Sequence, residues 1–191
     1  MQKFYKIVRV ATVPPLMASA LFIILGAFSR LDWVDSLLGI FFIGILPILA
    51  YPLQRFIPYY KDKGRDGQRN LAMVFSVSGY IIGCVLALIF NAPNMVILIY
   101  LDYLLSGVLL TLFNKLFHLK ASGHACGIVG PIAMLVYSGL YIPAAIGAVL
   151  TVFVFISSIK MKRHTLLQLL GGSAITIAAL LILLIPFELI L

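Results

Sequence analysis

Two of the chain's three histidines lie in short polar stretches between long apolar runs. His124 follows Lys-Ala-Ser-Gly at 120–123, and His164 follows Lys-Met-Lys-Arg at 160–163. Each therefore lies beside cations and just before a predicted helix, whose N-terminal N–H groups and dipole favour a bound anion. A phosphate dianion needs several fixed cations and N–H donors to offset its lost hydration, so these stretches predict phosphate chemistry.

The cations alone could have a simpler role, because lysine and arginine in short loops also set the topology of a membrane protein. This interpretation is equally good for Lys61, Lys63, Lys115 and Lys162. It does not explain why histidines accompany the cations at 124 and 164. A single interfacial histidine is more often structural, which is our interpretation of His118.

The composition places the chain in a lipid bilayer. Apolar residues make up 63% of the 191 residues and charged residues 10%, too few for an ordinary solvated surface. Apolar runs of about eighteen residues or more recur, each long enough to cross the hydrocarbon core as a helix. We therefore expect one all-α domain over 1–191, a polytopic bundle of transmembrane helices whose active site is formed by loops on one membrane face.

Apolar runs and turns give the expected elements of this bundle. The first 13 residues suit an amphipathic helix at the headgroup level, with Lys3, Lys6 and Arg9 three positions apart. Residues 59–70 are the most polar stretch and are expected to be a loop. Seven spans are expected, or six if the first is re-entrant or interfacial, at about 14–30, 36–57 (bent at Pro47 and Pro52), 71–90, 95–117, 125–139, 144–159 and 166–191.

The distribution of cations predicts the orientation. The N-terminus and the loops at 55–70, 114–124 and 160–164 carry thirteen of the fourteen Lys and Arg residues, so the positive-inside rule places them in the cytosol. The net charge of +8 does not indicate nucleic acid, because no extended basic face is present. Asp102 lies inside an apolar run, where we expect a structural hydrogen bond to Tyr or Ser of a neighbouring span.

The segments around both histidines resemble signatures of a known family. Lys120-Ala121-Ser122-Gly123-His124 is similar to the second signature of the type 2 phosphatidic acid phosphatase superfamily, usually Pro-Ser-Gly-His. The run Arg-His-Thr-Leu-Leu-Gln-Leu-Leu-Gly at 163–171 is similar to the third. A hairpin of two predicted spans separates them, as in that family. The resemblance covers about 120–172, and extends weakly to 61–70.

The resemblance implies a role for each matching residue. His164 would be the nucleophile that forms a phosphohistidine, and His124 the general acid for the leaving alkoxide. The implied phosphate-binding residues are Arg69, Lys120, Ser122, Gly123 and Arg163, together with Arg65 and Lys160.

The first signature, a lysine, six residues and Arg-Pro, is matched loosely, because seven residues separate Lys61 from Arg69 and Asn70 follows. Two positions of the third signature also depart from the family pattern. Ser158 stands where the third signature has arginine, so Lys160 or Arg163 must substitute. Gln168 stands where an aspartate is common, four residues after the nucleophile. Residues four apart share a helix face, so Gln168 can still accept a hydrogen bond from the His164 imidazole and orient it.

The activity implied is hydrolysis of a lipid phosphate or pyrophosphate, of the prenyl phosphate, phosphatidate or phosphatidylglycerol phosphate class, by a multi-pass protein of the cell's inner membrane. Neither metal nor cofactor is expected, and the partners are the lipid substrate and membrane lipids, not nucleic acid. A lipid phosphotransferase would use the same residues with another acceptor. A non-enzymatic lipid-binding or transport protein on the same fold is the alternative that the Gln168 and Ser158 departures favour. The oligomeric state is left open.

Overall fold

The protein is a bundle of helices, and no strand occurs in the ranges described by the computed structural model, 2–116 and 120–190, of which 186–190 are described by their backbone only. His118 lies outside these residues. In chain order the helices are α1 (Gln2–Ala11), α2 (Pro14–Ala27), α3 (Trp33–Gly39), the π-helical η1 (Ile40–Ile45), α4 (Leu46–Leu53), the 3-10 helix η2 (Gln54–Phe56), α5 (Pro58–Lys61), α6 (Gly64–Ile89), α7 (Asn94–Leu116), α8 (Gly123–Tyr137), α9 (Tyr141–Lys160) and α10 (Leu166–Ile190).

Within the described ranges, length and composition identify five helices that could cross a membrane, and six if the bent pair α1–α2 forms one span. They cover Trp33–Phe56, Gly64–Ile89, Asn94–Leu116, Tyr141–Lys160 and Leu166–Ile185. Helix α8 has 15 residues, which is about 22 Å at 1.5 Å per residue, shorter than a bilayer core. The expected fold class, an all-α bundle of membrane helices, is therefore confirmed.

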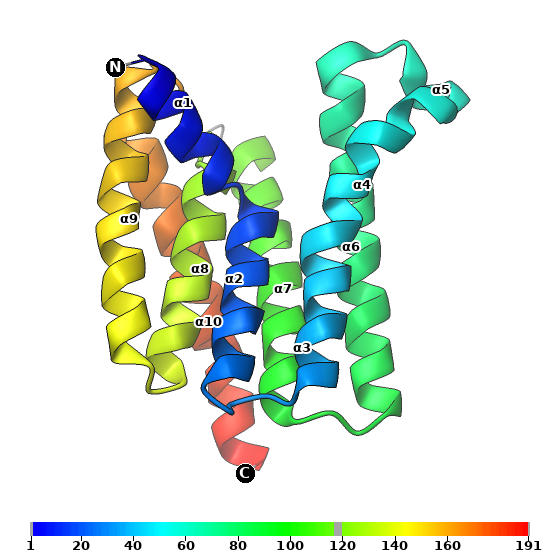
Figure 1. Cartoon of the computed structure of the whole chain (residues 1–191), viewed down its shortest axis with the longest axis vertical. Coiled ribbons are helices and arrows are strands. Elements are labelled where there is room, and N and C mark those ends of the chain that lie inside the picture. Colours follow the sequence, from blue (N-terminus) through cyan, green and yellow to red (C-terminus); the bar gives the residue numbers. More distant parts are fainter. Residues whose placement is uncertain (1, 117–119, 191) are drawn as a thin grey trace.

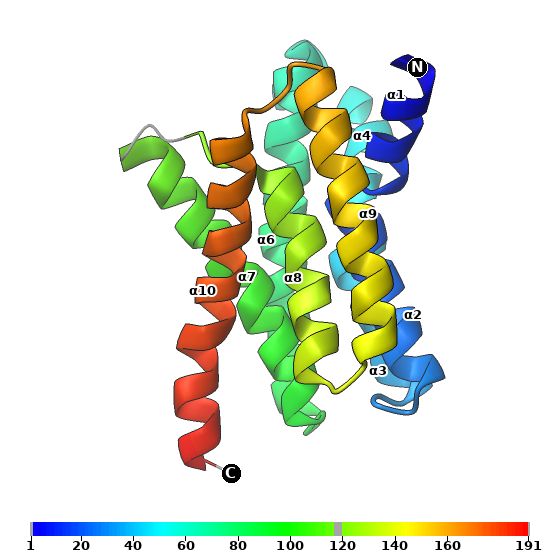
Figure 2. The same cartoon turned by 90° about the vertical axis from the view of Figure 1, so that its left-hand side faces the viewer.

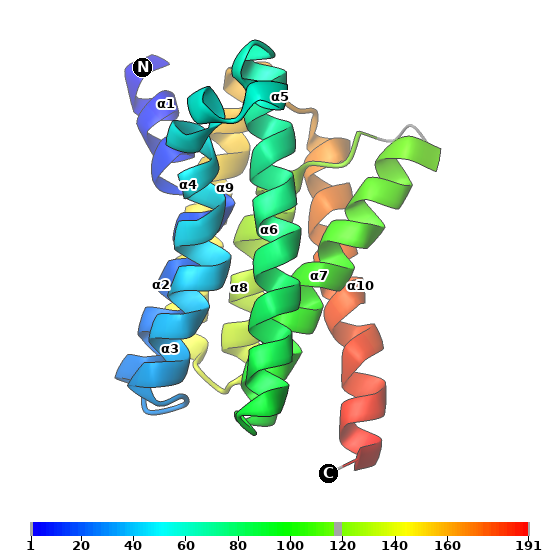
Figure 3. The same ribbon diagram turned by 90° about the vertical axis from the view of Figure 1, so that its right-hand side faces the viewer.

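Helix α8 lies at the centre of the bundle. It packs against α2, α9 and α10, while α6 packs against α4 and α7 on the other side (Figures 1 and 3). The N-terminus, the α9–α10 connection and the start of α6 lie at the same end of the bundle, and the C-terminus lies at the opposite end (Figures 1 and 2). This arrangement places the loops that carry both histidines at one end of the molecule.

The N-terminal residues form the expected amphipathic helix, α1. It packs along α9 and meets α2 at an angle of 55°. The bend falls before Pro14, because Val13 takes the extended conformation (φ −61°, ψ 146°) that a following proline favours. Consequently α1 crosses over the end of the bundle that holds the histidine loops.

The polar stretch at 59–70 is helical in most of its length, and the expectation of a loop is wrong there. Helix α5 occupies Pro58–Lys61 and α6 begins at Gly64 rather than near 71. Polar residues are compatible with a helix where it projects beyond the apolar layer, and the apolar pattern alone therefore placed this start too late. Helix α4 contains Pro47 and Pro52. The π-helical η1 directly precedes α4 and the 3-10 helix η2 directly follows it, so departures from α-helical geometry lie near both prolines at which a bend was expected.

The first turns of α8 and α10 are held together by a close backbone contact. The Ser122 N–H donates to the Gln168 carbonyl at 2.9 Å. A Cβ on Gly172 would lie 2.2 Å from the Ser122 carbonyl oxygen, so only glycine permits this approach. The expected close helix contact at Gly171-Gly172 is thus confirmed at Gly172.

Substitution of Gly172 by alanine should lower the free energy of unfolding by about 1–3 kcal/mol, because backbone must move to admit the Cβ. Thermal unfolding in detergent measures this loss. Gly107→Ala is the matched control, since a Cβ there meets no heavy atom within 4 Å. A Gly172→Ala protein as stable as the Gly107→Ala protein would contradict this packing argument.

Candidate active site

A Schellman motif ends α9 and sets the path of the loop that carries His164. The Arg163 N–H donates to the Ser158 carbonyl at 3.0 Å, and the Lys162 N–H donates to the Ile159 carbonyl at 2.9 Å. Lys162 has the left-handed φ of 53° that this motif requires and that glycine normally supplies. The backbone of Arg163 is therefore fixed against the last turn of α9.

A capping box begins α10 directly after this loop. The Gln168 N–H donates to the Thr165 hydroxyl at 3.3 Å, and the Thr165 N–H donates to Gln168 Oε1 at 3.2 Å. This is the reciprocal pair expected for Thr-x-x-Gln at a helix start, and it satisfies two N–H groups that otherwise lack partners. Both ends of the short loop between α9 and α10 are thus capped.

Gln168 also orients the His164 ring. Its Oε1 lies 3.2 Å from His164 Nδ1, the contact expected from their spacing. Because Oε1 already accepts from the Thr165 N–H, it is identified as the oxygen, and Nδ1 must be the donor. In the neutral form of His164 this contact selects the Nδ1–H tautomer, which leaves the Nε2 lone pair for attack on an electrophile.

His124 lies in the first turn of α8, after the helix cap. Ser122 caps this helix, its hydroxyl accepting from the Ala125 N–H at 3.3 Å. His124 Nε2 lies 3.1 Å from the Thr12 hydroxyl, which itself donates to the Val8 carbonyl at 2.7 Å. Since the Thr12 hydrogen is already used, Nε2 must donate to Thr12 Oγ1.

The surroundings of His124 disfavour its charged form. Burial, and then the nearby Arg9 and His164, lower the pKa of His124 to about 4. Burial acts by removing water from the imidazolium, and the neighbouring groups act by like-charge repulsion. His124 is therefore neutral at pH 7, and His164 is among the groups that lower its pKa.

The N-terminal segment contributes two residues that the sequence interpretation did not assign to the site. Arg9 donates a hydrogen bond from Nη1 to the Ser158 hydroxyl, and Thr12, directly after α1, accepts a hydrogen bond from His124. These partners are separated by 149 and 112 positions in the chain. The spacing of Lys3, Lys6 and Arg9 on one amphipathic face was the only sequence signal, and it predicted an interfacial helix.

Several predicted residues line one open pocket of about 710 Å³. They are Lys120, Arg163, His164 and Gln168, joined by Lys162, Thr165, Ile159 and Leu166. Lys160 lines a neighbouring pocket with Lys3 and Lys6, and Arg163 and Lys162 border both pockets. The structure therefore places His164 and two of the five predicted cations, Lys120 and Arg163, on one pocket, and Lys160 on the neighbouring pocket.

Four predicted phosphate-binding residues are placed differently. The Ser122 side chain is completely buried as the α8 cap, and Gly123 adjoins it at the helix start. Arg65 and Arg69 are exposed on the first turns of α6, which starts on the other side of the molecule from the end of α9 (Figure 1). Their assignment as phosphate ligands stays a prediction.

Asp102 is buried in α7, one turn before Ser106 on the same helix. The Ser106 hydroxyl donates its one hydrogen to Thr176 on α10 at 3.1 Å. Within the described residues Asp102 Oδ1 has no hydrogen-bond partner, and the bond expected from Asp102 to Tyr or Ser of a neighbouring span stays a prediction. Over the described ranges, no group of three or more His, Cys, Asp and Glu side chains could hold a metal ion.

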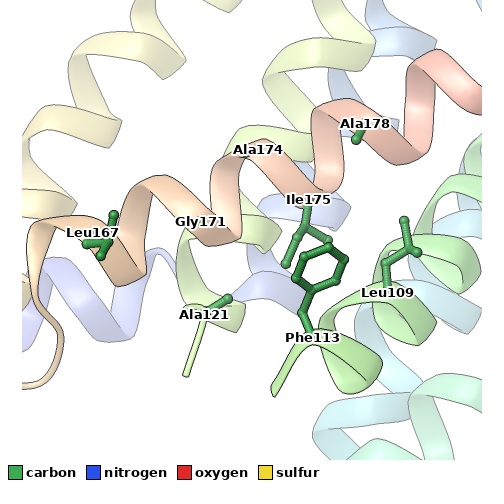
Figure 4. Close-up of a pocket in the computed structure, with 8 residues that line it drawn as sticks. All are labelled: Leu109, Phe113, Ala121, Leu167, Gly171, Ala174, Ile175 and Ala178. Carbon is green, nitrogen blue, oxygen red and sulfur yellow. The ribbon is translucent and has the colours of Figure 1, made fainter. Parts of the chain in front are cut away.

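An apolar groove adjoins the histidine pocket. It has a volume of about 330 Å³ between α7 and α10 and is lined by Leu109, Phe113, Ala121, Leu167, Gly171, Ala174, Ile175 and Ala178 (Figure 4). Adjacent residues divide between the two spaces: Lys120 and Gln168 line the polar pocket, and Ala121 and Leu167 line the groove. The polar pocket and the apolar groove therefore adjoin at the start of α10.

Comparisons of the chain with family models, with curated proteins and with solved structures give no match. The functional interpretation therefore depends on the geometry and chemistry of these residues.

The reciprocal cap predicts non-additive effects in a double-mutant cycle. Thr165→Val and Gln168→Leu should each lower the free energy of unfolding by about 1 kcal/mol, because each removes a partner of the same cap. The double variant should lose less than the sum, by about 0.5 kcal/mol or more. Chemical denaturation of the four proteins measures this, and strict additivity would contradict the capping box.

Removal of the Arg9 charge should raise the pKa of His124. The imidazolium of His124 is opposed by burial and by Arg9, so Arg9→Gln removes one of the causes that hold the pKa near 4. Histidine NMR titration of the two proteins measures the shift. The Lys3→Gln protein is the control for general loss of charge, and an unchanged or lower His124 pKa in Arg9→Gln would contradict the proximity.

Proposed function

We propose that this protein is a membrane lipid phosphatase, which hydrolyses a lipid phosphate or pyrophosphate through a phosphohistidine on His164. One observation carries the proposal: His164, whose Nδ1 is held by Gln168 so that Nε2 is left to the substrate, lies in a pocket with Lys120 and Arg163, and a second, partly buried histidine is near it. Such a cluster has the nucleophile, the proton donor and the charges that phosphoryl transfer requires. The resemblance to the type 2 phosphatidic acid phosphatase superfamily implies the same roles.

In the first step His164 Nε2 attacks phosphorus, and the bond from phosphorus to the lipid oxygen breaks. His124 gives a proton to the leaving oxygen. A bound phosphate dianion favours the imidazolium form of His124, so substrate binding raises the pKa of His124 and the ring takes up the proton that it then donates. Thr12 holds Nε2–H of His124, so the proton given to the lipid oxygen comes from Nδ1.

In the second step water attacks the phosphohistidine, His124 takes the proton of that water, and inorganic phosphate leaves. Gln168 accepts the Nδ1–H of His164 throughout and keeps Nε2 directed away from itself. An amide stabilises the ring's orientation without adding negative charge, so positioning carries more of the catalysis than a carboxylate partner would.

A lipid substrate is supported by the two adjoining spaces. The polar pocket offers Lys120, Arg163 and His164 to a phosphate head, and the groove between α7 and α10 offers an apolar surface to a hydrocarbon tail. Prenyl phosphates, phosphatidate and phosphatidylglycerol phosphate share this chemistry. The positive-inside rule favours access from the cytosolic leaflet of the inner membrane.

A phosphotransferase is the second candidate, because a phosphohistidine can also pass its phosphoryl group to a lipid hydroxyl. The product distinguishes it from a hydrolase: a phosphorylated acceptor lipid appears in place of inorganic phosphate. A non-enzymatic lipid-binding protein on the same fold would give neither product.

Purified protein in detergent should release phosphate from at least one lipid phosphate of a panel covering these classes. His164→Ala should lower kcat by about 10³-fold or more, because no other group forms the covalent bond. His124→Ala should lower it by about 10²–10⁴-fold, because the leaving oxygen loses its proton donor.

His118→Ala is the matched control, since it removes the third histidine, to which no catalytic role is assigned. Activity that survives His164→Ala would contradict the nucleophile assignment. A wild-type protein that is inert on the whole panel but binds these lipids would instead identify a lipid-binding protein.

A further inference from the structure

Arg9 is held close to the loop that carries the proposed nucleophile. Its guanidinium donates to the hydroxyl of Ser158, a completely buried residue on the last turns of α9. The carbonyl of the same serine accepts the Arg163 N–H at 3.0 Å. Ser158 therefore connects Arg9 of α1 with the backbone that leads directly into His164.

The charged groups that surround Arg9 are other cations. Arg163 is near enough to repel it, and Arg9 in turn affects His124. Among the described residues no carboxylate receives a hydrogen bond from Arg9, and its guanidinium donates to the neutral Ser158 hydroxyl. A partly buried guanidinium near Arg163 and His124 loses hydration and is repelled by Arg163, and a bound anion offsets both costs.

Arg9 differs in this respect from the other cations of α1. Lys3 and Lys6 are exposed and, with Lys160, line the pocket that neighbours the His164 pocket. Arg9 is partly buried, and Thr12, three residues further on and just after the end of α1, contacts His124. Two residues at the C-terminal end of this segment therefore reach the histidine site, which an interfacial anchor does not require.

We propose that Arg9 is a catalytic residue, whose guanidinium binds the phosphoryl oxygens of the group transferred to His164, and that α1 thereby completes the active site. This inference rests on the proposed phosphatase function for its catalytic part. Arg9 makes and breaks no covalent bond: it neutralises charge on the phosphoryl oxygens while the bond to the lipid oxygen breaks. The planar guanidinium donates two parallel hydrogen bonds to a phosphoryl group, which a lysine cannot do.

The proposal predicts a loss that can be rescued from another helix. Arg9→Ala should lower kcat by about 10²–10³-fold, and Arg9→Lys should recover only part of it. Because the Ser158 side chain touches the Arg9 guanidinium, an arginine at 158 can reach the same space once Arg9 is removed. The double variant Arg9→Ala/Ser158→Arg should therefore regain at least tenfold over Arg9→Ala.

Lys3→Ala is the matched control, because it removes one positive charge from the same helix at an exposed position, and it should remain within about twofold of wild type. Thermal unfolding of each variant in detergent identifies any that fail to fold, and for these Arg9→Gln replaces Arg9→Ala. Arg9→Ala activity within threefold of wild type would overturn the proposal, as would a loss equal to that of Lys3→Ala.

An anion-binding measurement separates this proposal from the phosphatase proposal. Orthovanadate and inorganic phosphate should raise the unfolding temperature of the wild type and of Lys3→Ala, but not of Arg9→Ala. If no lipid phosphate is hydrolysed and this pattern is observed, the phosphatase function fails and the Arg9 anion site stands. If orthovanadate stabilises Arg9→Ala as much as wild type, the Arg9 site is wrong whatever the hydrolysis assay gives.

Discussion

The backbone contact between Ser122 and the first turn of α10 holds the two halves of the site together. The Ser122 N–H binds the Gln168 carbonyl, and Gly172 allows the two chains to approach because it has no Cβ. Ser122 is also the cap of α8, two residues before His124, and Gln168 is the partner of His164. One contact thus fixes both histidine-bearing segments relative to each other.

Local capping motifs then determine how each functional side chain points. The Schellman motif at the end of α9 and the capping box at the start of α10 leave little freedom to the residues between them. Gln168 caps the helix and accepts from His164 with the same oxygen atom. The structural and the proposed catalytic roles of this residue are therefore inseparable, and the amide that departs from the family pattern is well suited to both.

The site combines high positive charge with adjacent apolar surface. Arg9, Arg163 and the two histidines gather where the described residues supply no carboxylate to any of them. The groove between α7 and α10 adjoins the pocket that holds Arg163 and His164, because Leu167 lines the groove and its neighbour Gln168 lines the pocket (Figure 4). Charge that an anion can neutralise, placed at the mouth of an apolar channel, is the arrangement that suits a phosphorylated lipid.

Sequence reasoning predicted the features that depend on local patterns. Apolar runs predicted helices near 95–117 and 166–191, and the four-residue spacing predicted the His164–Gln168 contact. It missed Arg9 and Thr12, because their partners lie more than a hundred positions away and only packing brings α1 across α9.

The Thr-x-x-Gln pattern at 165–168 is typical of a capping box, but the sequence interpretation assigned Gln168 only as the partner of His164. The start of α6 was placed too late because polar residues do not end a helix outside the apolar layer.

The central claim is that His164 becomes phosphorylated. Wild-type protein is mixed with a lipid phosphate that it hydrolyses, quenched rapidly in alkali and mapped by mass spectrometry. It should carry phosphate on His164, and the His164→Ala protein should carry none. Phosphate on another residue, or rapid hydrolysis with no phosphoprotein at any quench time, would contradict the account.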